Sequence, residues 1–391
     1  MKLSAVKAIE SVDCRHFNGY KPCRKNDNCD RSCPHFSFVN EVIVVIHLGA
    51  LGAVLRSTSL LRSLHRKHPH ARLIWVTEKS AMPLLQENSL IDRVVSVDEL
   101  IDIECLEFST SYVIDKSPRA IGVSRRLKAH SRKGFRLHPI NSAILPEDAD
   151  AEYLWLLGLN DHEKFFVNNK PEQQLTAEAL SLPYRRDSYI LNLTESEKRK
   201  ALDLRSQWSQ GSLPIIGINT GCSKTLPAKK LSVETHRKIC KELLSLGYSV
   251  VLLGGGPEDQ QRNQEIAVGL DVIQSNTMGG IREGAIAMQA TDVVLSGDSL
   301  GMHMAIALNK RIVAWFGPTC SHEIDLYELG QKIEAPVPCS PCWKKTCGFG
   351  DRMCFDQISV DVVVRALLKE VRILERHKTD FDTISLSSQS L

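Results

Sequence analysis

The sequence has no long apolar run and no strong excess of charge, and these two absences exclude several classes of protein. Its longest apolar stretches, such as residues 42–46, have the length of a β-strand and are far too short to cross a bilayer. The 49 lysines and arginines nearly balance the 46 aspartates and glutamates, which leaves a formal net charge of +3. Binding to nucleic acid needs a strong basic field, and this composition does not supply one.

Residues 1–13 also lack the apolar stretch of a secretory signal, so we expect a cytoplasmic protein. The slight positive charge permits weak attraction to an anionic bilayer, which is compatible with a peripheral contact with the inner membrane. Aromatic residues make up only 6% of the chain, but hydrophobic residues reach 43%, as in ordinary globular proteins. A chain of 391 residues has room for two or three domains.

Cysteine, in contrast, is abundant, with 12 residues. In a reducing compartment, clustered cysteines bind metals more often than they form disulfides. Residues 1–40 form a cysteine-rich head that is poor in apolar residues and needs a cross-link to become ordered. Four thiols in it suit tetrahedral zinc or iron: Cys14, Cys23, Cys29 and Cys33. The alternative is a loose head with unpaired thiols.

A second cysteine group lies near the end of the chain and includes a C-x-x-C pair. The spacing indicates a tetrahedral metal site made by Cys339, Cys342, Cys347 and Cys354. A redox pair or a disulfide is the alternative. Four cysteines leave no open position for a substrate, so we expect structural zinc or iron and no catalytic metal.

Strands and helices alternate along most of the chain, which is typical of parallel α/β sheets. Residues 41–185 form a first domain, with expected strands at 41–48, 71–76, 94–97 and 111–114. Residues 186–212 connect it to a second domain at 213–365, with expected strands at 214–219, 248–253, 292–295 and 312–316. Residues 366–391 end the last helix and form a tail that we expect to fray from residue 376.

Seven basic residues lie within 119–136 with no acidic residue among them. We interpret this stretch as a solvated loop. The alternative is a surface that meets an anionic acceptor or lipid head groups.

The turn at residues 296–299 lies between an expected strand and an expected helix at 302–308. The free N–H groups at such a helix start attract phosphate, which predicts a nucleotide-sugar diphosphate site at Asp298 and Ser299. The alternative is that either residue only caps the helix. Glycine turns after two neighbouring strands, at Thr220-Gly221 and Gly254-Gly255, support a nucleotide site at the same sheet edge.

Five stretches in order resemble glycosyltransferase family 9, the bacterial heptosyltransferase-like enzymes. They read LGALGAVLRST at 48–58, NTG at 219–221 with Lys229-Lys230, LLGG at 252–255, GDS at 297–299 with His303, and FGPT at 316–319. The resemblance spans roughly residues 41–370. It implies a GT-B fold, in which two Rossmann-like domains with parallel sheets face each other across a cleft.

The implied reaction is inverting transfer of a sugar, often heptose from ADP-heptose, to a glycolipid such as a lipopolysaccharide core or to a protein. The acceptor domain contributes the turn at Gly49 and Gly52. Residues implied at the donor site are Thr220, Gly221, Lys229, Gly254, Gly255, Asp298, Ser299 and His303. Lys224 and Lys230 are nearby substitutes for Lys229, and His303 either touches the donor or packs inside the domain.

Two departures from the family pattern bear on the chemistry. The family has an aspartate base after the glycine turn, where this chain has Ala53, and alanine cannot accept a proton. His47 and Asp115, at the ends of two expected strands, are candidate catalytic replacements. A glycine also follows Ser299 one residue late, at Gly301, which we expect to alter backbone freedom beside the diphosphate.

Ala53 motivates a second hypothesis, that the protein is a catalytically inactive binder of nucleotide-sugars. A third hypothesis, a GT-B epimerase of nucleotide-sugars, needs acids placed to remove a proton from carbon, and the sequence offers no convincing pair.

Overall fold

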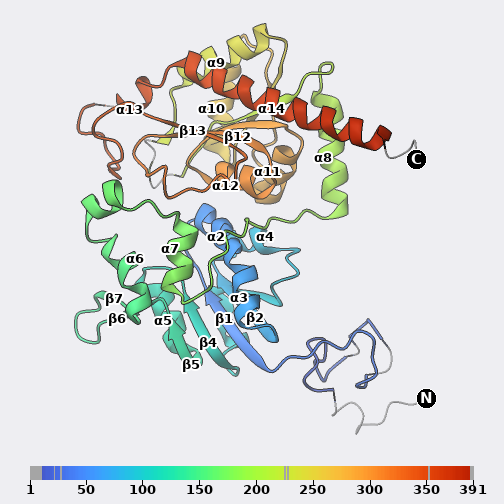
Figure 1. Ribbon diagram of the computed structural model, residues 1–391, viewed down its shortest axis with the longest axis vertical. Helices are drawn as coiled ribbons and strands as arrows, with labels where there is room; N and C mark the ends of the chain where they lie inside the picture. Colours follow the sequence, from blue (N-terminus) through green and yellow to red (C-terminus); the bar gives the residue numbers. More distant parts are fainter. Residues whose placement is uncertain are drawn as a thin grey trace.

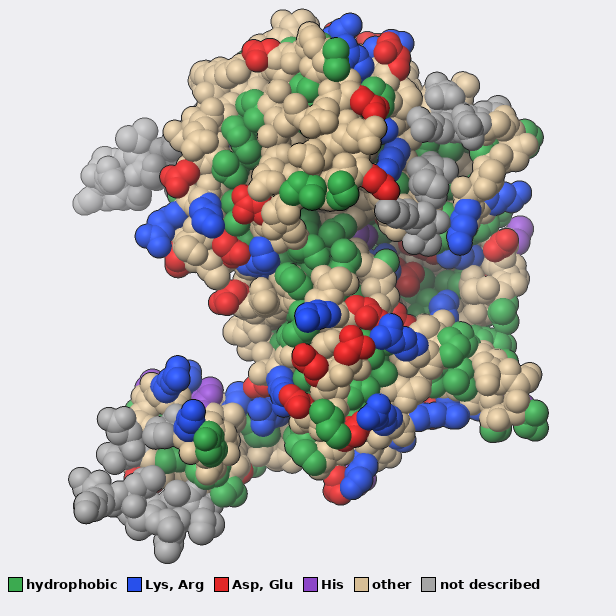
Figure 2. Space-filling view, turned by 180° about the vertical axis from the view of Figure 1, so that it is seen from behind, with side chains coloured by type: hydrophobic (Ala, Val, Ile, Leu, Met, Phe, Trp, Pro, Cys, Tyr) green, Lys and Arg blue, Asp and Glu red, His purple; other side chains and the backbone are tan. Residues whose placement is uncertain are grey.

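The computed structural model describes residues 11–387, apart from 22, 27, 28, 224, 225, 227, 228, 351 and 352. Lys224 therefore lies outside the described residues. Two α/β domains lie one above the other, and the N-terminal head projects from the far side of the first domain (Figure 1). Figure 2 shows the surface hollowed between the two domains, and we call this hollow the interdomain groove.

The first domain is built on a parallel five-stranded sheet in the order β3-β2-β1-β4-β5. Its central strand is almost completely buried because apolar residues cover both of its faces, as the unbroken run at 42–46 predicts. The strands are β1 (Glu41–Ile46), β2 (Ala71–Thr77), β3 (Arg93–Ser96), β4 (Glu107–Val113) and β5 (Lys128–Lys133), with a separate hairpin of β6 (Phe135–Leu137) and β7 (Ile144–Pro146).

The helices of the first domain are short, and the one expected through residue 67 is divided by a 3-10 turn. The α-helices are α2 (Leu51–Ser57), α3 (Leu61–Lys67), α4 (Met82–Leu85), α5 (Pro118–Arg126), α6 (Glu152–Leu156) and α7 (Glu172–Ala179). The 3-10 segments are η1 (Thr58–Leu60), η2 (Lys79–Ala81), η3 (Val97–Asp102) and η4 (Ala149–Ala151), and η5 (Glu163–Val167) is a π-helix.

The basic stretch at 119–136 is not a loop, so our interpretation of it was wrong. It contains α5 and β5, and Ser117 caps that helix by accepting a hydrogen bond from the Ala120 N–H at 3.2 Å. Arg126 pairs with Glu104, and Lys133 pairs with Asp148. Distant carboxylates therefore neutralise much of the charge that looked unpaired in the sequence.

The second domain has a parallel six-stranded sheet in the order β10-β9-β8-β11-β12-β13. Its strands are β8 (Ile215–Asn219), β9 (Ser249–Leu253), β10 (Ile273–Gln274), β11 (Val293–Gly297), β12 (Arg311–Phe316) and β13 (Gly330–Glu334). Its helices are α9 (Val233–Ser245), α10 (Pro257–Ala267), α11 (Gly280–Gln289), α12 (Leu300–Ala307), α13 (Met353–Asp356) and α14 (Val360–Ser387).

Helix α14 packs on β12 and α9 within the second domain (Figure 1). Val363, Leu367 and Val371 are almost fully buried at helical spacing, which explains why this helix closes the domain. The backbone is helical through Ser387, so the fraying expected from residue 376 is not seen up to that residue; residues 388–391 lie outside the described part. Of the helices in that part, none combines the length and apolar character needed to span a bilayer.

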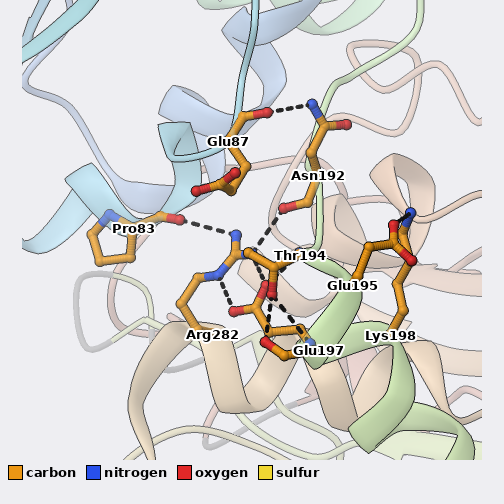
Figure 3. Close-up of polar contacts among 9 residues, drawn as sticks. Pro83, Glu87, Asn192, Thr194, Glu195, Glu197, Lys198 and Arg282 are labelled. Atoms are coloured by element: carbon orange, nitrogen blue, oxygen red, sulfur yellow. Dashed lines mark hydrogen bonds and ion pairs between the residues drawn. The ribbon is translucent and has the colours of Figure 1, made fainter. Parts of the chain in front are cut away.

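The connection between the domains runs extended to Thr194 and then forms α8 (Glu195–Trp208). Thr194 and Glu197 make a reciprocal capping box that fixes where this helix begins. Arg282 of α11 binds the Glu197 carboxylate and donates hydrogen bonds to the Asn192 carbonyl at 2.8 Å and the Pro83 carbonyl at 3.3 Å (Figure 3). One guanidinium thus joins both domains and the connection, and we call this set of contacts the hinge junction.

The head is fastened to the edge of the first domain by Arg15. Its guanidinium donates a hydrogen bond to the Ala71 carbonyl at 2.8 Å and pairs with Asp92. A backbone bridge between Cys14 and Phe38 closes the head on itself. The head lies far from α13 and the second cysteine group, so the two groups do not meet (Figure 1).

Candidate functional site

The starts of α2 and α12 face each other across the domain boundary. A Cβ atom at Gly52 would lie 2.6 Å from the ring of His303, which means that only glycine allows this approach. Both helices follow a strand of their own sheet, so their free N–H groups lie at the carboxyl edges of the two sheets. The predicted acceptor turn and the predicted donor turn are therefore brought together.

Asp298 and Lys229 form the charged centre of the donor turn. The Lys229 Nζ lies 2.7 Å from Asp298 Oδ2, although 69 residues separate them. Burial alone would raise the pKa of Asp298, but the nearby Lys229 ammonium and His303 hold that pKa below its ordinary value. Trp315 donates a hydrogen bond to the Lys229 carbonyl at 3.0 Å and so fixes the lysine backbone beside the turn.

Neither Asp298 nor Ser299 acts as a side-chain cap. Ser299 occupies the N-cap position of α12, and its side chain makes no capping hydrogen bond. Its hydroxyl instead accepts a hydrogen bond from the Asn219 amide at 3.0 Å. The interpretation of this turn as a simple helix cap is therefore not supported.

Asn219, which was not among the predicted site residues, ties the ends of β8 and β11 to α12. Its amide donates to the Gly221 carbonyl, Ser296 Oγ and Ser299 Oγ at 3.0–3.2 Å. A Cβ at Gly301 would lie 2.5 Å from the Asn219 side chain. The displaced glycine thus provides space for Asn219, and its φ is not positive. The expected change in backbone freedom beside the diphosphate stays a prediction.

His303 packs between the domains. Its side chain is almost fully buried, its ring centroid lies 5.8 Å from that of Tyr189, and Nε2 lies 4.0 Å from Asp298 Oδ1. Burial and the positive charge of Arg56 lower the pKa of His303 to about 3, so the ring is neutral at physiological pH. Within the described residues its Nδ1 has no hydrogen-bond partner.

The glycines at the ends of β8 and β9 enclose a carboxylate of the chain itself. A Cβ at Gly221 would lie 1.9 Å from Asp259, and one at Gly254 would lie 2.7 Å from it. The Gly255 N–H donates to Asp259 Oδ2 at 2.9 Å. The Thr220 side chain is buried and donates to Asn263 at 2.5 Å. These contacts explain the sequence pattern structurally, and a donor contact of these residues stays a prediction.

The candidate replacements for the base, His47 and Asp115, lie together behind the first glycine turn. His47 Nε2 is 3.4 Å from Asp115 Oδ1, and the other carboxylate oxygen accepts the Leu48 N–H. A Cβ at Gly49 would lie 2.6 Å from Asp115, so the turn covers the pair closely. Burial lowers the pKa of His47.

Sequence reasoning missed a group of charged residues at the domain boundary. Arg56 lies 3.7 Å from Glu172, and Lys164 lies 3.6 Å from Glu323. The Glu172 N–H also donates to the Glu323 carbonyl at 2.9 Å, which joins the two domains. Arg56 falls within a motif stretch and could have been singled out; the others lie in segments without a motif, so the sequence gives no signal for them.

The segment at 339–354 reaches this boundary through Trp343. The Lys164 Nζ lies 4.1 Å from the centre of the Trp343 ring, and Lys229 Nζ lies 5.8 Å from it. The indole N–H donates to Cys320 Sγ at 3.4 Å. A residue between two of the predicted metal ligands is therefore in contact with a lysine from each domain.

Each predicted group of four cysteines lines a single cavity. Cys339, Cys342, Cys347 and Cys354 surround one beside Gly317 and Pro318. Burial and the three neighbouring thiols raise the pKa of Cys354 to about 11, so four thiolates would be unstable there without a cation. In the head, Cys14, Cys23, Cys29 and Cys33 surround a second cavity with His16 and His35. Each set supplies four thiols, the ligand type of a tetrahedral zinc or iron site, but among the described residues no three of these sulfur atoms lie within 4.8 Å of one another.

Among the described residues, Cys320, His322 and Glu323 are also close enough together to hold an ion, with their ligand atoms within 4.8 Å of one another. Each already has another partner: Cys320 accepts from Trp343, His322 Nε2 lies 3.1 Å from the Lys164 carbonyl, and Glu323 faces the Lys164 ammonium. We assign no metal to this group.

Comparison with known proteins supports the predicted family resemblance. The model of glycosyltransferase family 9 (heptosyltransferase) matches residues 161–352. Lipopolysaccharide heptosyltransferase 2 of Escherichia coli is 26% identical over 302 residues, which cover 71% of this chain and 83% of that protein.

Two solved structures share the fold. The glycosyltransferase family 9 protein of Veillonella parvula has a TM-score of 0.67 at 18% identity, covering 86% of this chain and 98% of the other. The iron-containing dodecameric glycosyltransferase TibC of enterotoxigenic E. coli has a TM-score of 0.54 at 14% identity, covering 87% and 77%. These neighbours confirm the predicted GT-B fold, and the family match together with the heptosyltransferase relative supports a heptosyltransferase-like protein of glycosyltransferase family 9.

Proposed function

We propose that the protein transfers a sugar, most simply a heptose, from a nucleotide-diphosphate donor to a cell-envelope glycan, lipid or protein, with inversion at the transferred carbon. The observation that carries the proposal is the Lys229–Asp298 pair at the start of α12, a helix whose His303 packs against Gly52 in the glycine turn of the other domain. The curated heptosyltransferase relative supports the choice of sugar and of a glycolipid acceptor. ADP-heptose is therefore the first donor to test.

The proposed mechanism assigns the leaving group to the second domain. As the sugar bond breaks, negative charge develops on the diphosphate. The Lys229 ammonium and the free N–H groups at the start of α12 stabilise that charge because they are already oriented toward it. Asp298 holds the lysine in place. The acceptor binds to the first domain near Gly49 and Gly52, and bulk water is excluded where α2 and α12 meet.

We also propose that each four-cysteine cavity holds a structural iron or zinc ion. The four thiols that line each cavity support this, and the iron-containing neighbour TibC makes iron a candidate. A tetrahedral ion there would cross-link a segment that has little apolar core of its own. Replacing Cys339 and Cys342 with serine should remove about one metal equivalent and lower the melting temperature, measured by elemental analysis and calorimetry. Unchanged metal content in this variant would contradict the assignment.

The protein is proposed to work in the cytoplasm, with its glycolipid acceptor presented at the inner membrane. Sedimentation of the purified protein with anionic vesicles, compared with neutral ones, would measure the peripheral contact.

Ala53 supports a second candidate, an inactive protein that binds nucleotide-sugar without transferring it. The two candidates differ in turnover. We would incubate the protein with ADP-heptose, UDP-hexoses, GDP-hexoses and ADP-hexoses, follow thermal stability, and then analyse the products with and without acceptor. A selective shift with sugar transfer supports the enzyme, and a selective shift without any release supports the inactive binder.

Lys229 offers a matched variant pair for the same assay. Lys229→Ala should abolish the stabilisation by donor, because the variant loses the cation beside Asp298. Lys230→Ala should retain it, because the neighbouring lysine has no ion pair with Asp298 in the described structure. Equal loss in both variants would argue against a specific phosphate contact.

A further inference from the structure

Ala53 leaves the expected position without a base, but two carboxylates lie close to the same turn. Arg56, one helical turn further along α2, lies 3.7 Å from Glu172. Glu172 opens α7 of the first domain, and its N–H donates to the carbonyl of Glu323 in the second domain at 2.9 Å. A carboxylate from each domain is thus available where donor and acceptor must meet.

Of the two carboxylates, Glu323 has fewer polar partners. Its side chain is only 10% exposed, and its nearest cation, Lys164 Nζ, is 3.6 Å from Oε1, too far for a hydrogen bond. Among the described residues the carboxylate makes no hydrogen bond at all. A buried carboxylate normally has hydrogen-bond partners, so this one has capacity to accept a proton from a bound molecule.

The other acidic and basic candidates are already engaged. Asp115 accepts the Leu48 N–H and contacts His47, and both lie behind Gly49. Glu172 already has the Arg56 guanidinium as a partner, 3.7 Å away. These contacts suit structural or positioning roles.

We propose that Glu323 is the general base of the transfer, in place of the missing aspartate at position 53. Its carboxylate takes the proton of the acceptor hydroxyl while that oxygen forms a bond to C1 of the sugar. The bond from C1 to the diphosphate oxygen breaks, and its electron pair leaves with the diphosphate. This assignment rests on the proposed glycosyl transfer.

The electrostatic surroundings suit this role. Burial and the negative charge of Glu172 raise the pKa of Glu323 to about 7, and Asp298 adds to the rise. Lys164 and Arg56 oppose it. A base with a pKa near the working pH is both sufficiently ionised and sufficiently basic.

The test compares Glu323→Gln with Glu172→Gln and with the exposed Glu328→Gln on the same segment. In full-length protein that transfers sugar, Glu323→Gln should lower kcat by about 10²–10⁴-fold while donor affinity by calorimetry stays within about twofold. The wild-type rate should rise with pH through about 7, and the variant should lose that rise. Glu328→Gln should behave as wild type.

Two outcomes would overturn the inference in distinguishable ways. If the wild type transfers sugar and Glu323→Gln retains its rate and pH profile, Glu323 is not the base although the proposed function stands. A loss of rate in Glu172→Gln alone would move the role to Glu172. If the wild type transfers nothing from any donor that it binds, the proposed function fails, and the base assignment fails with it.

Discussion

The domain boundary has two charged groups, the hinge junction and the contacts around Glu323, and they surround a glutamate in opposite ways. At the hinge junction Arg282 gives Glu197 a side-chain hydrogen bond that, against the effect of burial, lowers its pKa to about 2 (Figure 3). Among the described residues the Glu323 carboxylate accepts no hydrogen bond from a cation, and burial raises its pKa to about 7. Both carboxylates belong to glutamates at the domain boundary. Glu197 has a guanidinium that donates hydrogen bonds to it, whereas Glu323 is the more buried of the two.

This difference separates charges that hold the molecule together from charges that remain available for chemistry. A carboxylate bound by a guanidinium in good geometry stabilises the fold and has no capacity left for a ligand. A carboxylate that is buried without hydrogen bonds costs stability, and such cost is common at functional sites. The comparison therefore predicts which variants change activity and which change stability.

The largest effect on donor binding should come from the donor turn. Asp298→Asn should weaken donor binding by about 10–100-fold, because Lys229 loses the carboxylate that orients its ammonium. Calorimetric titration with the donor measures this affinity, and urea unfolding measures stability. Affinity equal to that of the wild type would show that the pair has no part in binding.

At the hinge junction the effect should fall on stability instead. Arg282→Ala removes the partner of the largely buried Glu197 and the hydrogen bonds to Asn192 and Pro83, and should cost about 2–4 kcal/mol of unfolding free energy. Donor affinity of the folded fraction should stay close to wild type. Chemical denaturation at pH 7 provides the measurement, and a stable variant with weakened donor binding would reverse our assignment of this junction.

The pH dependence of stability should have opposite signs at the two sites. The folded protein binds the Glu323 proton more tightly than the unfolded chain, so this residue reduces stability as pH rises from about 4.5 through about 7. Glu323→Gln should therefore stabilise the protein at pH 8 by about 1–3 kcal/mol and leave stability at pH 4 nearly unchanged.

Glu197 should show the reverse dependence. Its stabilisation is present above about pH 4.5 and is lost as pH falls toward 2. Unfolding curves of the wild type, Glu323→Gln and Arg282→Ala across this pH range would test the contrast. Parallel curves for wild type and Glu323→Gln would contradict it.

The smallest effect should come from the ion pair next to the hinge junction. Lys198 and Glu195 lie on the same helix start, 2.7 Å apart, but both side chains are largely exposed (Figure 3). Water and salt screen such a pair, so Lys198→Ala should leave the unfolding midpoint unchanged within error. A midpoint shift comparable to that of Arg282→Ala would mean that burial does not explain the contrast.

Sequence reasoning worked where a pattern is local. The unbroken apolar run of β1 and the glycine turns followed by helices are local patterns, and the turn that they single out at Asp298 lies beside Lys229 in the structure. Sequence reasoning failed at residues 119–136, where it predicted a solvated loop. The carboxylates that neutralise Arg126 and Lys133 come from distant parts of the chain and are brought there only by the fold. The same limit hid Glu323 and Glu172, whose proximity exists only once two domains are packed together.

The glycine at position 52 has a consequence for engineering. Because a single added carbon would lie 2.6 Å from His303, the absence of a side chain at this position allows the two domains to approach each other closely. Alanine, serine and valine at position 52 would form a series of side chains of increasing size, which should hold the two domains progressively further apart. The gap that a transferred group must cross is thus set by a side chain that is absent, and it could be adjusted without touching any charged residue.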